Sequence, residues 1–190
     1  MPYSPNLRIE LIDTGTQAGT WGTTTNTNLG TLVESAIAGY ISVSITSANQ
    51  ALTALDGTAD QSRNAVIALT TTTTAAFNVY APPAEKTYVI YNASAYTATV
   101  YNSTVLGNAT AAGSGVAIPA GKTMTVWTDG TNFGVQNSHV IGTVVGDVTG
   151  NLTGNVTGNV TGDVTGNLSG NVSVGSGTST FNNVTINGTL

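Results

Sequence analysis

The spacing of hydrophobic residues predicts one helix near the start of the chain. Thr27 or Asn28 is suited to cap its first turn, and Gly39 is suited to end it. The stretch 14–28 is rich in Gly, Thr and Asn, and we expect it to form turns. Five apolar residues recur at intervals of one, three and four and so share one helical face: Leu29, Leu32, Val33, Ala36 and Ile37.

After this helix the hydrophobic period changes to two. Residues 41–45 alternate strictly between apolar and polar side chains, which is typical of a strand with one buried face. The pair Asp129-Gly130 is a hairpin-turn signal between two later strands. We therefore expect a mainly β module, a small antiparallel β-sandwich or barrel, with one short helix across one end or one face. Further strands are predicted over 65–70, 77–80, 87–91, 96–101, 123–127 and 133–135.

Residues 146–173 form a strict tetrapeptide repeat. Seven consecutive units follow the pattern Gly-[Asn/Asp]-[Val/Leu]-[Thr/Ser]. Because side chains alternate along an extended chain, the large apolar residue and the glycine of each unit fall on the same face. We expect the apolar residues to line the axis of a parallel homotrimer as a ladder: Val148, Leu152, Val156, Val160, Val164, Leu168 and Val172.

A single copy of the repeat cannot stabilise itself. Burying one Val or Leu per unit contributes about 1.5–3 kcal/mol, whereas ordering each backbone residue costs on the order of 1–2 kcal/mol. Hydrogen bonds between chains must supply the difference, which favours a trimeric β-stalk. A flexible linker is the alternative for such a Gly/Asn/Thr tract. The regular placement of Val or Leu favours the ordered stalk, because a spacer needs no periodic hydrophobic residues.

These patterns divide the chain into three parts. Residues 1–138 form the predicted N-terminal β-rich module. Residues 139–175 form the predicted repeat stalk. Residues 176–190 form a short terminal β segment that either ends the chain or leads into further sequence.

The amino-acid composition excludes several classes of function. Only 7% of the 190 residues are charged, and 4 basic residues against 9 acidic ones give a formal charge of -5. This balance excludes an electrostatic nucleic-acid binder, and no apolar run reaches the roughly 18 residues of a membrane span. With no cysteine and 1 histidine, no cofactor or metal site is expected. We expect a non-enzymatic protein, because an acid pair from Glu10, Asp13 and Glu34 would need the fold to bring them together.

Two parts of the module resemble a known family. Residues 7–12, Leu-Arg-Ile-Glu-Leu-Ile, are followed by 19–29 with the motif Trp-Gly-x-x-x-Asn-x-Asn. These segments are similar to the N-terminal region of tail fibre and related virion proteins of marine tailed bacteriophages. Residues 116–122 and 128–132 look like the later part of the same module, and Gly-Asn-Val-Thr repeats are common in such fibres.

The resemblance implies a trimeric fibre located in the phage virion. It implies that this module attaches to tail or baseplate proteins, and that a distal region contacts a host-surface glycan. The candidate attachment residues are then Trp21, Asn26, Asn28 and Leu29. Trp21 has a second interpretation, in which its ring closes one end of the sandwich core.

Two other functions use the same sequence features. A capsid decoration or head-fibre protein would apply the same trimeric architecture at a different anchoring site. A glycan-binding module would use aromatic rings as stacking surfaces, although strand alternation places many of these rings inside the module. The aromatic candidates are Tyr88, Tyr91, Tyr96, Tyr101 and Trp127.

Overall fold

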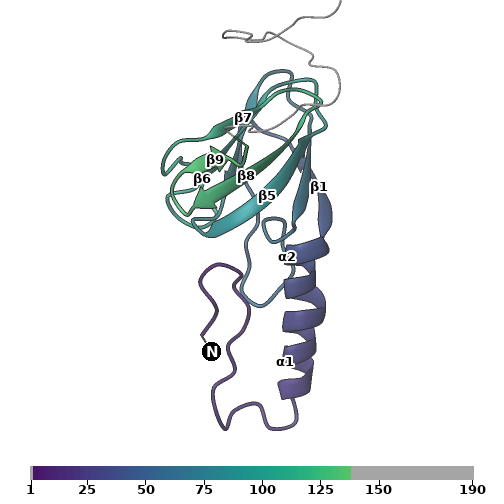
Figure 1. The fold of residues 1–190 in the computed structure, drawn as a ribbon, viewed down its shortest axis with the longest axis vertical. Helices are drawn as coiled ribbons and strands as arrows, with labels where there is room; N and C mark the ends of the chain where they lie inside the picture. The colour runs from purple at the N-terminus through teal and green to yellow at the C-terminus, as the bar shows by residue number, and fades with distance from the viewer. Residues whose placement is uncertain (1, 138–190) are drawn as a thin grey trace, which may run out of the picture. The chain divides into compact units, whose positions relative to one another are not determined.

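Alternating side chains build two β-sheets that pack face to face (Figure 1). The computed structural model describes residues 2–137, so the predicted repeat stalk with its ladder residues and the predicted terminal β segment, 176–190, lie outside the described residues. The five-stranded sheet has the order β1 (Tyr40–Ile45), β3 (Val66–Thr71), β5 (Glu85–Asn92), β8 (Thr123–Asp129) and β9 (Phe133–Val135). The four-stranded sheet has the order β2 (Asn49–Ala51), β4 (Phe77–Ala81), β6 (Ala98–Asn102) and β7 (Val116–Ile118).

From β1 to β6 the chain passes from one sheet to the other at every strand. As a result β1, β3 and β5 are parallel neighbours in one sheet, and β2, β4 and β6 are parallel neighbours in the other. Only the last strands pair antiparallel, with β7 on β6 and β8 between β5 and β9. The prediction of a mainly β sandwich is confirmed, and the prediction of an antiparallel one is wrong because both sheets are mixed.

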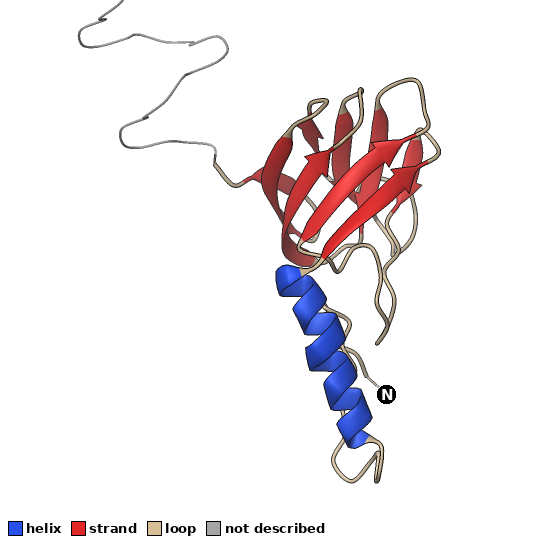
Figure 2. Cartoon of the chain, turned by 90° about the vertical axis from the view of Figure 1, so that its right-hand side faces the viewer, coloured by secondary structure: helices blue, strands red, loops and turns tan. Residues whose placement is uncertain are grey.

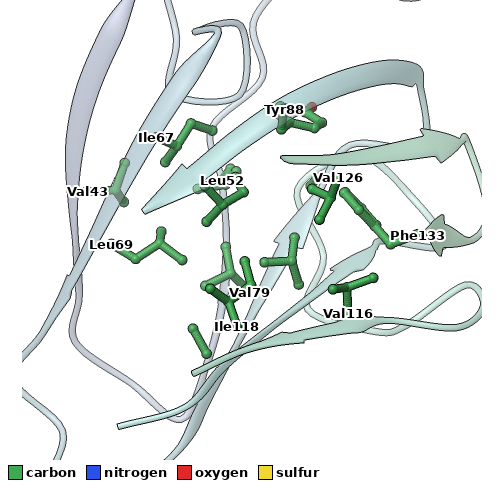
Figure 3. Close-up of a cluster of buried hydrophobic side chains, with 14 of the residues drawn as sticks. Val43, Leu52, Ile67, Leu69, Val79, Tyr88, Val116, Ile118, Val126 and Phe133 are labelled. Carbon is green, nitrogen blue, oxygen red and sulfur yellow. The ribbon is translucent and has the colours of Figure 1, made fainter. Parts of the chain in front are cut away.

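The core lies between the two sheets and takes side chains from every strand except β2 (Figure 3). In β1 the inward positions alternate with polar outward ones: Val43 and Ile45 are buried, and Ser42 and Ser44 are exposed. Leu52, which directly follows β2, fills the core at that edge. This alternation is the reason that the strand positions could be predicted from the sequence.

Buried polar side chains tie the two layers together. Asn92 is fully buried at the end of β5, and its amide nitrogen donates to the Ile118 carbonyl at 2.9 Å and to the Tyr96 carbonyl at 2.7 Å. The Asn102 amide on the opposite sheet pairs with the Thr128 hydroxyl. These bonds satisfy groups that would otherwise lose their hydration on burial.

The hairpin predicted around Asp129-Gly130 is confirmed between β8 and β9. Gly130 has a φ of 89°, a conformation that side chains disfavour. The Asp129 carboxylate accepts the backbone amides of Asn132 at 2.6 Å and Thr131 at 2.8 Å. These two hydrogen bonds stabilise the anion and lower the pKa of Asp129.

The helix is longer than the sequence predicts, and it extends away from the sandwich (Figure 2). It runs without a break through α1 (Trp21–Thr27), the π-helical segment η1 (Asn28–Val33) and α2 (Glu34–Ala38). The expected position across one end or face of the sheets is therefore wrong, as is the expectation of turns over 21–28. Within Trp21–Ala38 only Asn28 and Leu32 are buried, and neither belongs to the sandwich core.

Candidate functional site

The helix leads directly into the five-stranded sheet, which fixes its direction. Gly39, the residue between α2 and β1, has no room for a side chain, because a Cβ atom would collide with the Ser35 carbonyl oxygen and the Asn64 side chain. The Ser35 carbonyl accepts the Gly39 amide at 3.0 Å and the Ala65 amide at 3.1 Å. The C-terminal end of the helix is thus held at the start of β3.

An N-terminal hairpin, residues 2–11, runs beside the helix (Figure 1). Tyr3 and Glu10 form its antiparallel bridge. Asn28 holds this hairpin with both ends of its amide: its oxygen accepts the Glu10 amide at 3.2 Å, and its nitrogen donates to the Glu10 carbonyl at 2.8 Å. The Glu10 carboxylate in turn accepts the Gln17 amide nitrogen at 2.5 Å. The helix is therefore supported along one side by polar contacts.

Large apolar side chains remain uncovered on the helix. Trp21 is 62% exposed, Leu29 60% and Ile37 75%. They recur every eight residues, close to two turns when the wider π-helical winding is included, and together they form what we term the exposed helix stripe. Tyr40, the first residue of β1, follows the helix and is 63% exposed. Contiguous exposed apolar patches mark interaction sites on proteins, and the exposed helix stripe is the candidate for such a site on this module.

The helix itself carries little charge. Between residues 21 and 40 the only ionisable side chains are Glu34 and the Tyr40 phenol. A partner that covers the stripe therefore has few charges to desolvate, which lowers the cost of association. An open hollow of about 380 Å³ lies beside the base of the helix, lined by Ser35, Tyr40 and Gln61 among others. This hollow is a concave surface next to the exposed helix stripe.

The structure separates the four predicted attachment residues into two groups. Trp21 and Leu29 lie on the exposed helix stripe, and Asn26 is also exposed on α1. Asn28 is 9% exposed, and both ends of its side-chain amide bond to Glu10. The alternative in which Trp21 closes the sandwich core is wrong, because its ring lies at the far end of the helix and is mostly exposed.

Sequence reasoning missed Ile37 and Tyr40 as surface residues. The predicted helical face groups Leu29, Leu32 and Ile37 together, whereas the structure buries Leu32 completely and exposes the other two. The reason is the π-helical winding, marked by the bond from the Glu34 amide to the Leu29 carbonyl five residues earlier. This wider winding turns Leu29 away from Leu32.

The aromatic residues considered for glycan stacking are distributed between core and surface. Tyr88 is buried beside Phe133, and burial raises the pKa of its phenol well above the ordinary value. Tyr101 stacks on Tyr80 at 5.7 Å between ring centroids. Tyr96 is half-buried, so only two of the five aromatic candidates are exposed: Tyr91 at 38% and Trp127 at 46%.

The carboxylates considered as an acid pair are not joined by any contact that the structure describes. Glu10 bonds to Gln17, and Glu34 lies in the first turn of α2. Residues 2–137 contain no cluster of three or more His, Asp and Glu side chains that could hold a metal ion. Among the helices described, none has the length and hydropathy of a membrane span.

Compared with known protein families, curated proteins and solved structures, the chain matches none.

Proposed function

We propose that this chain is a structural protein of a phage virion, a trimeric tail fibre or its N-terminal part, that has no catalytic activity. It attaches to tail or baseplate proteins through the helix and projects toward the host surface for adsorption. The observation that carries the proposal is the exposed helix stripe, Trp21, Leu29 and Ile37, on a helix that extends away from the sandwich (Figure 2).

The energetics of the helix favour a covering partner. Isolated helices of this length are marginal in water, and Thr, Asn and Gly, which are abundant from residue 21 to 31, are weak helix formers. Burying the exposed parts of Leu29 and Ile37 would contribute about 1–2 kcal/mol each. Attachment therefore stabilises the helix and uses the side chains that the module leaves uncovered.

The position of the motif that resembles virion proteins supports attachment through the helix. Residues 19–29, which carry the Trp-Gly-x-x-x-Asn-x-Asn motif, include the whole of α1. The π-helical segment follows directly, and π-helical turns occur frequently at functional sites. The segment that resembles virion proteins and the segment with uncovered apolar residues are thus largely the same.

The repeat supports an assembly of three chains. Its seven units each offer one Val or Leu that a single extended chain leaves in water. Low overall charge suits an interface made of backbone hydrogen bonds and β-branched packing, because little of its free energy is ionic or screened by salt.

A photo-cross-linking amino acid at residue 29, incorporated into virions, tests the attachment surface. We expect cross-links from position 29 to a tail or baseplate protein. The matched control is position 105, because Val105 is an apolar residue of similar exposure, 63%, on a loop of the sandwich. Equal cross-linking from both positions, or none from position 29, contradicts attachment through the helix.

The same cross-link distinguishes the tail from the head. A cross-linked capsid protein, together with antibody label on heads in electron micrographs, would make the chain a head fibre or capsid decoration protein. Label on tails supports the proposal as stated.

A glycan-binding role is the second candidate, and Trp127 favours it. The Trp127 ring lies over Gly134, where a Cβ atom would be 2.8 Å from the ring, and 46% of the side chain is exposed. An aromatic face backed by glycine is suited to stack on a sugar. A glycan-array signal that Trp127→Ala abolishes would support this role, and a blank array would remove it.

A further inference from the structure

Three of the chain's four basic residues surround one small cavity. Arg8 of the N-terminal hairpin, Arg63 of the loop before β3, and Lys86 of β5 all line it. The fourth basic residue, Lys122, lies elsewhere, next to β8. Such convergence is unexpected in a chain with a formal charge of -5.

Arg63 is buried with part of its guanidinium unpaired. Its side chain is 2% exposed, and Nη2 donates to the Leu55 carbonyl at 2.8 Å, the Thr58 carbonyl at 3.2 Å and the Asp60 carboxylate at 3.1 Å. Its Nε and Nη1 atoms are buried and have no hydrogen-bond partner. The Nε atom of Arg8 is also buried and has no hydrogen-bond partner. Buried donors that stay unpaired destabilise the fold, so an acceptor beside these atoms would stabilise it.

The charges around the cavity do not balance. Arg8 pairs with Asp56 at 2.6 Å, and the buried Asp60 carboxylate pairs with Arg63. Lys86 has no carboxylate in its hydrogen bonds; Nζ donates to the backbone carbonyls of residues 62, 63 and 64 and lies 4.4 Å from the centroid of the Tyr88 ring. The Asp60 carboxylate also lines the cavity and attracts the Lys86 ammonium, but it is already paired with Arg63, so three cationic side chains share two carboxylates.

The size of the cavity limits what it can hold. Its free space is about 10 Å³, enough for one water molecule or one monatomic ion and too small for sulfate or phosphate. A water molecule would accept hydrogen bonds from the guanidinium but leave the extra charge. A small anion would accept those hydrogen bonds and also neutralise the extra positive charge.

We propose that this cavity binds one monovalent anion of the halide class, which locks the N-terminal hairpin onto the sandwich. Arg8 of the hairpin and Arg63 of the sandwich donate hydrogen bonds to the ion, and the Lys86 ammonium, whose three N–H groups already donate to backbone carbonyls, attracts it through its charge alone. The backbone at Arg8 supports this role: it has a φ of 53°, unusual for a residue other than glycine, and its carbonyl accepts the Gly57 amide at 2.9 Å. This inference does not depend on the proposed virion function.

Thermal unfolding of the full chain tests the proposal. In sodium chloride, compared with sodium gluconate at equal ionic strength, we expect the Tm to rise by about 4 °C for each tenfold increase in chloride above its Kd. In crystals grown in sodium bromide, we expect an anomalous scattering peak between Arg63 and Lys86. A Tm that follows ionic strength alone, or a crystal in which the cavity holds water, overturns the proposal.

A pair of variants separates the ion from general salt effects. Lys86→Gln removes the unbalanced charge and keeps hydrogen-bond donors for the carbonyls, so the chloride dependence of the Tm should be lost. Lys122→Gln changes the net charge of the chain equally and should retain that dependence. Equal chloride dependence in the two variants overturns the proposal.

Discussion

Gly39 and Gly30 differ in the space that is available for a side chain. Gly39 is packed so closely against Ser35 and Asn64 that any side chain must displace them, whereas a Cβ atom on Gly30 meets nothing within 4 Å. Gly39→Ala should lower the free energy of unfolding by about 1–3 kcal/mol through overpacking. Gly30→Ala should raise it by up to about 1 kcal/mol, because alanine favours the helix. Denaturant unfolding of both variants measures the difference, and a Gly39→Ala protein as stable as the wild type contradicts the packing at this junction.

Asn28 holds the N-terminal hairpin, and its neighbour in the motif does not. Asn28→Ala should leave the Glu10 amide and carbonyl without partners and cost about 1–3 kcal/mol. Hydrogen exchange should show the Glu10 amide losing protection. Asn26→Ala is the matched control, because Asn26 is exposed on the same helix. Unchanged protection of Glu10 in Asn28→Ala would show that the amide bridge is not what holds the hairpin.

Lys86 makes stability depend on pH. Desolvation by burial lowers the pKa of its ammonium from 10.5 to about 8, with Asp60 opposing and Arg63 adding to the shift. Above pH 8 the folded protein has released this proton while the unfolded chain retains it, so stability rises with pH by up to about 1.4 kcal/mol per unit. The rise should end near pH 10, where the raised pKa of Tyr88 acts in the opposite direction.

Unfolding curves between pH 7 and 9.5 in sodium gluconate, which supplies no halide, measure this rise. Lys86→Gln should remove it and Lys122→Gln should keep it. A wild-type stability that is flat across this range contradicts the buried state of the Lys86 ammonium.

At the scale of elements, strand positions were predictable and strand directions were not. The alternation in 41–45 matches β1 closely because it records which side chains face the core. That alternation is the same in parallel and antiparallel strands, so it could not show that the chain crosses between sheets at each step. Two strands of three residues were missed. β7, Val116–Ile118, is too short to establish an alternation, and β2, Asn49–Ala51, has no apolar pattern, its core contact coming from Leu52 just beyond it.

The helix was predicted only in its second half. Residues 29–37 carry apolar side chains at helical spacing, whereas 21–28 consists of residues with weak helix propensity and one Trp. Support from the N-terminal hairpin through Asn28 and Glu10 lets these residues remain helical. Such a tertiary contact leaves no periodic signal in the sequence.

Exposure separates the roles of neighbouring helix residues. Leu32→Ala should cost about 2–5 kcal/mol, because Leu32 is fully buried. Leu29→Glu should change the free energy of unfolding of the module by less than about 0.5 kcal/mol. It should nevertheless prevent incorporation into virions by placing a charge in the attachment surface. Val105→Glu, at a site of similar exposure, should leave incorporation intact. Normal incorporation of Leu29→Glu contradicts attachment through the stripe.

For the whole molecule, the sequence singled out Trp21 and Leu29 but did not predict the other exposed apolar residues near them. The exposure of Ile37 depends on a helix that leaves the sandwich, and Tyr40 is exposed because it takes an outward position of β1. The cluster of Arg8, Arg63 and Lys86 was equally hidden, because these residues are far apart in the chain and meet only in the fold. Scarcity of charge did indicate that few interactions of this protein would be ionic.

The mass of the full chain in solution tests the central claim most directly, since an attached fibre of this kind requires three chains. Sedimentation velocity in moderate salt should give a single species of three times the 19.1 kDa of one chain. Its mass should not fall on dilution or in high salt, because the proposed trimer relies on apolar contacts and backbone hydrogen bonds, which salt does not screen. A folded species of 19.1 kDa that persists at high protein concentration contradicts the account.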